Sequence, residues 1–518
     1  MPAVVTDQFR ISNAGNFVDS VLDTNNSYYV FLGLPNPAVP VSGFGRTTSD
    51  SRWDSNTPSP TDNLQYSSHY KNTAMFGRKV SSANIRRLIR KVSWTTNTRY
   101  DMYRHDYSIS NPAPNSELSR LYDSNYYVIN SDYKVYICIH NGSSGSNLKG
   151  NLSKDEPTFS DLEPSAAGTS GDGYIWKYLF TVSPNDIIKF DSTDYVVVPN
   201  EWETSTDTQI QNVREAGDSD VNLNQIKTVY IADAGQDYSD GVVSILGDGT
   251  GASVSITTND KGAITDAVIT AGGSGYTYGI VDLKTLQPKG GSLPNPAKLI
   301  PIIPPSRGHG YNIYTELGTD KVLVYARFDD STKDFPVDTK FCQVGIVKNP
   351  TTSSSTTTIF TGSEYSSLYA VKLDSVGSTP TVGVAMTQAT ASGGVAQGYV
   401  ASYDSQTQVL KYFQDRSSYF SNEKDQTDAT DVSTVSNVLA FESSSAPIAP
   451  FTGSVDEAFS GIKTTIDSKE INLGVTFTDG LADPEINKKT GDVIYIDNRP
   501  LVERDSRQKE DVKIILEF

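Results

Sequence analysis

The sequence predicts an all-β protein with few short helices, and three observations point to this class. Tyrosine is frequent, with 29 residues, whereas tryptophan and methionine occur four times each. Short apolar runs alternate with spacers rich in Ser, Thr, Gly and Asn, the pattern of strands joined by turns. With 37% hydrophobic and 20% charged residues, the chain is globular, and 518 residues suffice for about three domains with their own cores.

The charge balance argues against a nucleic-acid partner. The chain carries 43 basic and 61 acidic residues, for a formal net charge of −18. Nucleic-acid binding depends on Lys and Arg, which release counterions from the phosphates. An acidic surface instead supports solubility and charge-complementary docking to other proteins.

Neither a signal peptide nor a membrane span is expected. Residues 1–10 lack the basic and apolar regions of a signal peptide, and no apolar stretch approaches the length of a membrane-spanning helix. We therefore expect a protein made in the cytoplasm, with no membrane insertion. Cys138 and Cys342 lie in strand-like runs without a CxxC motif, which favours free buried thiols over a disulfide.

The first piece of the body, residues 1–204, begins with an aromatic strand at Tyr28–Leu32. A Pro-rich loop around Trp53 follows and includes Pro58–Asp62, where proline cannot continue a strand ladder. Further on, Tyr126–Ile129 and Tyr133–Ile139 predict a hairpin.

Ser82–Val92 has the periodicity of an amphipathic helix. Apolar residues fall at positions i, i+3, i+4 and i+7, from Ile85 to Val92. The other face carries the basic residues Arg86, Arg87, Arg90 and Lys91. They have two interpretations: a solvated cationic face, or a docking patch for an acidic neighbour.

Two further segments of this piece predict buried strands. Gly171–Phe180 reads GDGYIWKYLF, an Asp-Gly turn followed by a strand that is apolar at nearly every position. Tyr195–Pro199, YVVVP, is the next such run. Both are expected inside a core.

An internal repeat marks an inserted β module at residues 205–305. The segment that starts with Gly235 and Tyr238 recurs 38 residues later at Gly273 and Tyr276. Two units are too few for a solenoid, so we expect one compact module of two related halves.

A second β module is predicted at residues 351–467, after the linker TTSSSTTT. Its strand signals are Tyr369–Leu373, Gly394–Tyr403 and Val409–Phe413, and an acidic loop lies at Ser421–Thr434. The body resumes at residues 306–350 and ends with closing strands in residues 468–518. A discontinuous body can accept two insertions in its loops, because the entropic cost of closing a loop increases only slowly with its length.

No combination of residues indicates an enzyme, a cofactor or a metal site. The four histidines are scattered without metal-ligand spacing. Gly-rich segments miss the phosphate-loop and nucleophile-elbow patterns. His309 and Arg307 lie between glycines, where a tight junction between module and body is the main interpretation and a ligand site the alternative.

Several blocks resemble a known family, in order along the chain. These are the Gly171–Phe180 block, YVVVP at Tyr195–Pro199, and the terminal GDVIYIDNRPLV and KIILEF. They resemble the baseplate wedge subunit 8 family of T4-like contractile-tailed phages (myoviruses), and the chain would be a divergent member enlarged by the two insertions. The resemblance covers about half of the chain, the body pieces.

The resemblance implies a fold, a location and partners. It implies layered β-sandwich domains, a homodimer, and contacts to other baseplate wedge subunits. The protein would be a structural part of the virion tail baseplate, assembled in the host cytoplasm and moving with the baseplate on contraction.

Two alternatives from other classes are kept. The Tyr- and Gly-rich repeat and the Ser/Thr-rich insertion also suit a peripheral tail protein whose modules bind host-surface glycan. A tail-associated hydrolase is the other alternative, for which the sequence offers only carboxylates without an evident pair.

Overall fold

A computed structural model describes most of the chain. It covers residues 4–33, 57, 59–60, 62, 71, 73–218, 223–286, 288, 295–329, 340–382, 384–391, 393–414, 440–503 and 508–518. Strands make up 44% of the structure and helices 11%, which confirms the predicted all-β class. Most of the predicted loop around Trp53, and the whole acidic loop at Ser421–Thr434, lie outside the described residues.

The chain forms two compact units. Unit 1 comprises residues 1–18, 86–323 and 515–518, and unit 2 comprises residues 19–85 and 324–514. The chain passes between them in four elements: α1 (Asp7–Leu22), β3 (Ile85–Arg90), β15 (Lys321–Phe328) and β27 (Glu510–Glu517). Each unit is therefore built from separate pieces of the sequence.

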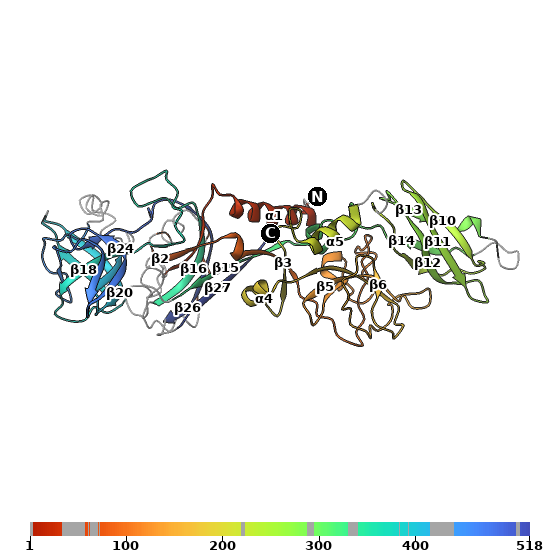
Figure 1. Cartoon of the computed structure of the whole chain (residues 1–518), viewed down its shortest axis with the longest axis horizontal. Coiled ribbons are helices and arrows are strands. Elements are labelled where there is room, and N and C mark those ends of the chain that lie inside the picture. Colours follow the sequence, from red (N-terminus) through yellow and green to blue (C-terminus); the bar gives the residue numbers. More distant parts are fainter. Residues whose placement is uncertain are drawn as a thin grey trace. The chain divides into compact units, whose positions relative to one another are not determined.

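Unit 1 holds the following further elements along the chain (Figure 1): the 3-10 turn η2 (Leu121–Asp123), β4 (Tyr127–Ile129), β5 (Lys134–Asn141), β6 (Ser165–Ala166), β7 (Tyr174–Thr181), α4 (Pro184–Phe190), β8 (Tyr195–Val198), α5 (Thr208–Asp218), β9 (Val229–Asp233), β10 (Gly241–Gly247), β11 (Thr250–Thr258), β12 (Ile264–Ser274), β13 (Gly279–Val281), η3 (Leu283–Thr285), β14 (Lys298–Pro301) and α6 (Ile313–Leu317).

One sheet of unit 1 has the order β4-β5-β7-β6. The predicted hairpin is confirmed, because β4 and β5 pair antiparallel with Val128 opposite Tyr136. The predicted buried strand is β7, in which Trp176 is fully buried and stacks on Tyr174 with 5.3 Å between the ring centroids. Aromatic packing of this kind provides much of the core of the sheet.

The helix predicted at Ser82–Val92 is wrong. The structure has a short 3-10 turn, η1 (Ser82–Asn84), followed by strand β3, which pairs antiparallel with β8. Arg87 lies opposite Val198 and Arg90 opposite Tyr195. A strand buried on both faces also places apolar residues at i, i+3 and i+4, so the helical periodicity was ambiguous.

A helix that was not predicted, α1, lies near the beginning of the chain. Its buried residues Ile11, Ala14 and Val18 are at most 6% exposed and follow helical spacing. This signal was present in the sequence, although Gly and Asn within the segment have low helix propensity.

The inserted stretch 205–305 contains a sheet of order β12-β11-β10-β13 and the pair β9-β14. Apolar residues from Ile226 to Ile303 form one core cluster between them. The two tyrosines of the repeat, Tyr238 and Tyr276, are 7% and 1% exposed and belong to this cluster. The module boundaries at 205 and 305 remain a prediction.

Unit 2 holds β1 (Tyr28–Gly33), β2 (Ala74–Lys79), η1, β16 (Lys340–Lys348), β17 (Glu364–Ser366), β18 (Tyr369–Ser375), β19 (Ala385–Ala389), β20 (Val395–Asp404), β21 (Val409–Phe413), β22 (Ser454–Val455), β23 (Gly461–Ile466), β24 (Lys469–Phe477), β25 (Leu481–Ala482) and β26 (Asp492–Glu503).

Two sheets dominate unit 2. The first has the order β17-β2-β1-β16-β26, so the predicted closing strand β26 pairs with β16, which lies far upstream in the sequence. The second has the order β19-β20-β21-β18-β22 and contains the three strands predicted in the second insertion. The boundaries of that insertion at 351 and 467 also remain a prediction.

Two expectations about single features can be compared with the structure. Cys138 and Cys342 carry buried thiols that are not joined in a disulfide, as predicted. Among the helices of the described ranges, none is both long enough and apolar enough to cross a bilayer.

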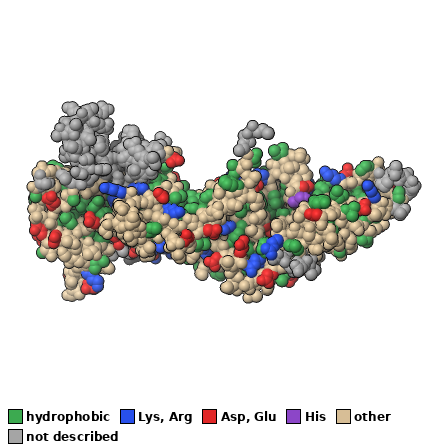
Figure 2. Space-filling view, turned by 90° about the horizontal axis from the view of Figure 1, so that it is seen from above, with side chains coloured by type: hydrophobic (Ala, Val, Ile, Leu, Met, Phe, Trp, Pro, Cys, Tyr) green, Lys and Arg blue, Asp and Glu red, His purple; other side chains and the backbone are tan. Residues whose placement is uncertain are grey.

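On the face shown in Figure 2, acidic and basic side chains are interspersed.

Candidate interaction site

The four basic residues predicted as a patch lie on β3 and directly after it. Arg86 forms an ion pair of 2.8 Å with Asp186. Arg87 is only 9% exposed, and its guanidinium lies 3.8 Å from the ring centroid of Tyr314. A desolvated cation–π contact contributes about 1–2 kcal/mol. Arg86 and Arg87 are therefore held by neighbours within unit 1.

Arg90 and Lys91 are anchored differently. One Arg90 nitrogen, Nη2, donates to two main-chain carbonyl groups and to the side-chain oxygen of Asn125, each at 2.9 Å. The Lys91 ammonium pairs with Asp191 at 3.0 Å. Both residues also line a cavity, so the structure brings only half of the predicted patch to one recess.

This cavity has a volume of about 490 Å³. Its walls come from β3, the start of β8, η2, and the link between α6 and β15. The lining residues are Leu88, Ile89, Arg90, Lys91, Arg120, Tyr122, Asp123, Tyr127, Thr193, Asp194, Tyr195, Leu317, Gly318, Asp320 and Lys321.

The buried part of the lining is apolar. Ile89 is 3% exposed, and Tyr127 and Leu317 are each 2% exposed. The Tyr127 hydroxyl donates to the main-chain carbonyl of Arg90 at 2.7 Å, and burial raises the pKa of this phenol. These buried lining residues are thus neutral at ordinary pH.

The rim is charged, and its cations have acidic partners. Lys321 pairs with Asp320 at 2.9 Å and with Glu517 at 3.2 Å. Arg120 pairs with Asp7 of α1 and lies 3.5 Å from Asp123. These pairs hold several chain segments around one opening.

Asp194 differs from the other carboxylates of the rim. It is exposed, and its main-chain N–H donates to the Ser192 hydroxyl at 3.1 Å. Within the described part of the chain, no hydrogen-bond donor or cation pairs with its carboxylate. Asp194 therefore leaves an acceptor open to a group that enters the cavity.

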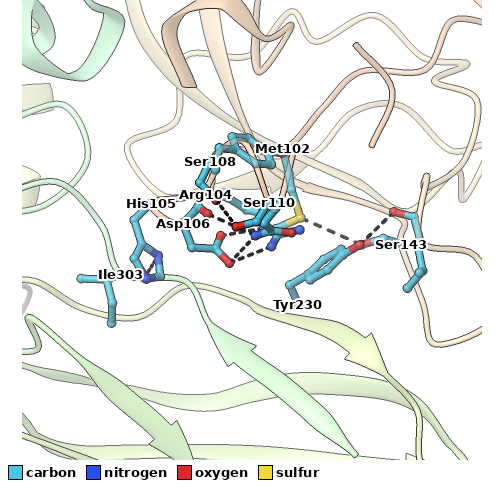
Figure 3. A network of polar contacts seen from close by, with 12 residues as sticks. Met102, Arg104, His105, Asp106, Ser108, Ser110, Ser143, Tyr230 and Ile303 are labelled. Atoms are coloured by element: carbon cyan, nitrogen blue, oxygen red, sulfur yellow. Dashed lines mark hydrogen bonds and ion pairs between the residues drawn. The ribbon is translucent and has the colours of Figure 1, made fainter. Parts of the chain in front are cut away.

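A second polar cluster, the Arg104 joint, connects the loop after Arg99 to the inserted stretch (Figure 3). Arg104 is 1% exposed and donates two hydrogen bonds of 2.9 and 2.8 Å to Asp106. Its guanidinium lies 3.9 Å from the ring centroid of Tyr230 on β9. The Nδ1 atom of His105 accepts the N–H of Ile303 at 3.2 Å. The joint thus fixes both ends of the β9–β14 region to the loop.

Burial and charge set the ionisation states in this joint. Burial lowers the pKa of His105, although Asp106 opposes this shift. A protonated Nδ1 could not accept the Ile303 N–H, so the observed contact requires a neutral imidazole. For Asp106, burial is the largest single cause and acts upward, but the hydrogen bonds and charge of Arg104 and the smaller effects beside them together outweigh it, so the pKa of Asp106 is lowered.

His309 takes part in a buried network. It is 7% exposed, and its Nδ1 lies 2.5 Å from Glu316 Oε1. The other oxygen of Glu316 accepts the Gly310 N–H at 2.7 Å. The Arg307 guanidinium stacks 4.0 Å from the ring centroid of Tyr311. These contacts fit the interpretation of a tight junction, and the alternative ligand site stays an untested hypothesis.

Sequence reasoning missed Asp194, Arg120 and Lys321 as members of one site. They are separated by more than seventy residues of sequence, and no local motif joins them. In the described ranges, no cluster of three or more His, Cys, Asp or Glu side chains is arranged to hold a metal ion. A role of the four basic residues in docking an acidic partner remains a prediction.

Comparison with known proteins gives one informative similarity. No family model matches the chain. The chain is 27% identical over 225 residues to baseplate wedge protein gp8 of Enterobacteria phage T4, which covers 38% of this chain. The match spans 60% of the length of that relative. The chain is thus a distant relative of a phage baseplate wedge protein.

Proposed function

We propose that this chain is a structural, non-enzymatic subunit of the baseplate wedge in a contractile phage tail. The distant similarity to a baseplate wedge protein carries the proposal. In this role the protein assembles as a homodimer, binds other wedge subunits, and moves with the baseplate on contraction. It belongs to the virion tail, and it is assembled in the host cytoplasm.

The build of the chain fits a mechanical role. Ion pairs, stacked arginines and buried hydrogen bonds join segments that are far apart in sequence within each unit. In unit 2, for example, Tyr325 and Arg327 of β15 bind the Asp511 carboxylate of β27 at 2.7–2.9 Å. Such links transmit force between elements, and a change of state then occurs at subunit interfaces.

The solution mass of the purified chain tests this proposal. Light scattering coupled to gel filtration would give the mass of the chain alone and mixed with the other wedge subunits of its phage. We expect a mass near twice 56.3 kDa, which increases when the wedge subunits are added. A monomer that binds none of them would refute the proposal.

Glycan binding by the inserted modules is a separate hypothesis. This hypothesis requires that the tyrosine rings of the repeat are exposed and can stack on sugars, yet Tyr238 and Tyr276 are buried. Their hydroxyl groups also bond the main chain: Tyr276 donates to Ile245 at 3.0 Å, and Tyr238 accepts from Ala297 at 3.1 Å. These two rings are not available to stack on a sugar, so the repeat does not favour this alternative.

A further inference from the structure

We propose that Arg87 on β3 anchors a binding site for one small oxyanion, a carboxylate or a phosphate-like group. The site lies within unit 1, beside α1 and the ring of Tyr314, and Arg87 is not part of the cavity described above. This inference goes beyond the proposed function and does not depend on it.

Arg87 is buried without a hydrogen-bond acceptor. It is 9% exposed, and its Nε is fully enclosed and has no hydrogen-bond partner. In the part of the chain that the structure describes, no carboxylate pairs with its guanidinium and no oxygen accepts from its N–H groups. Most buried polar groups have a partner, and a buried charge without one is destabilising. Arg87 thus offers donors and a positive charge to a group that its own fold does not supply.

Two other arginines of unit 1 show that Arg87 is an exception. Arg104 is more deeply buried and donates two hydrogen bonds to Asp106. Arg86, the neighbour of Arg87 in sequence, forms its ion pair of 2.8 Å with Asp186. The fold therefore provides carboxylates for these two guanidinium groups and none for Arg87.

The contact with Tyr314 positions the Arg87 guanidinium but leaves its donors open. The ring covers a face of the planar group at 3.8 Å, whereas the N–H groups project in the plane. The ring is itself held in place, because the Tyr314 hydroxyl donates to the carbonyl of Pro199 at 2.7 Å and accepts the N–H of Trp202 at 3.1 Å. A fixed ring of this kind prepares the guanidinium for a ligand, which lowers the entropic cost of binding.

The terminal nitrogens of Arg87 are the accessible ones. Unlike Nε, they are not enclosed. Gly15 of α1 places no side chain beside them: a Cβ atom at this position would lie 3.4 Å from Nη2 and 3.7 Å from Cζ. Parallel N–H groups of a guanidinium match two oxygen atoms of a carboxylate or phosphate, and such paired, charge-assisted bonds are the strong ones. The geometry therefore suits an oxyanion.

The test measures the melting temperature of the full-length chain while an oxyanion is added. Sodium phosphate and sodium acetate are the two probes, and sodium chloride keeps the ionic strength constant. Arg87→Met removes the proposed site and keeps an apolar side chain against Tyr314. Arg104→Met is the matched control, because it removes a buried arginine that already has a carboxylate partner.

In chloride alone, we expect Arg87→Met to melt at or above the temperature of the wild type, because methionine replaces a buried charge that has no partner. Arg104→Met should melt lower. Two charge-assisted hydrogen bonds support a Kd of about 1 mM. A hundredfold excess of phosphate should then raise the melting temperature of the wild type by about 3–5 °C, along a curve that saturates.

The response to the oxyanion should depend on Arg87 alone. Arg104→Met should keep the rise, and Arg87→Met should lose it. Arg87→Lys should bind about tenfold more weakly, because an ammonium cannot form the paired contact. With a net charge of −18, the chain attracts few anions at random, so a saturating rise indicates a specific site. A rise with acetate alone would assign the site to carboxylates, and a rise with phosphate alone to phosphate-like groups.

Two results would overturn this inference. Equal shifts without saturation in the wild type and in Arg87→Met would be a general salt effect. A loss of stability in Arg87→Met as large as that in Arg104→Met, measured in chloride, would mean that the charge of Arg87 is already satisfied within the fold.

Discussion

Replacing Arg104 by methionine should loosen the Arg104 joint by a measurable free energy. Methionine keeps most of the apolar stem but removes the charge and both hydrogen bonds to Asp106. Removing one partner of a fully buried ion pair costs about 3–5 kcal/mol. The Asp106 side chain is 23% exposed, so water can solvate the carboxylate that is left behind. We therefore expect a loss of about 2–3 kcal/mol.

Part of this loss should come from the cation–π contact with Tyr230. Tyr230→Leu keeps an apolar body on β9 but removes the aromatic face. A double-mutant cycle of the two substitutions should give a coupling energy of about 1–2 kcal/mol, as for a desolvated cation over a ring. A coupling energy near zero would mean that the 3.9 Å approach contributes packing alone.

Hydrogen exchange followed by mass spectrometry measures these energies locally. The free energy of opening is read, in wild type and variants, from peptides that contain the substituted contact: β9 and Ile303 for Arg104→Met, and β15 and Asp511 for Arg327→Met. Arg327→Met is the matched control, because Arg327 also makes two hydrogen bonds to one carboxylate, Asp511, but its side chain is 45% exposed. An exposed pair contributes at most about 1 kcal/mol. If Arg104→Met costs no more than Arg327→Met, the reasoning from burial is wrong.

Two further predictions concern buried ionisable groups of unit 1. Because burial lowers the pKa of His105 in the folded state, its stabilising contact with Ile303 is complete above the unfolded pKa of about 6.5. It is lost as the pH falls from there toward the folded pKa. A melting-temperature profile should therefore decline below about pH 6.5, and less steeply in His105→Gln; parallel profiles would contradict this. Glu316→Gln should cost about 1–3 kcal/mol in denaturant unfolding, since an amide cannot accept from both His309 and Gly310 in the same geometry. Unchanged stability would show that the second carboxylate oxygen of Glu316 does not stabilise this network.

The sequence predicted strands well where burial on one or both faces gave clear runs, as in β7, β8 and β26. It failed at β3 because an apolar run with basic residues fits a helix and a doubly covered strand equally. What decides between them is tertiary: β8 pairs with the segment, and the ring of Tyr314 covers Arg87. Those partners lie more than one hundred residues away, where no local pattern can indicate them.

The same limit applies to the candidate site. Arg90 and Lys91 were found because cationic residues cluster in sequence. Asp194 was not, because an isolated aspartate before a strand looks like a turn residue. Only the fold brings it to the cavity that Arg90 and Lys91 also line.

The pairing of β9 with β14 has a consequence for inheritance. Val229 lies opposite Pro301, so the chain enters and leaves this core cluster through neighbouring antiparallel strands. A gene segment for such a module can be gained, lost or exchanged while the host loop needs to close only a short gap. The two larger units differ, because the chain passes between them four times. A single recombination point in the gene would separate pieces of sequence that belong to the same unit. The two units are therefore expected to be inherited together, whereas the module can be exchanged by itself.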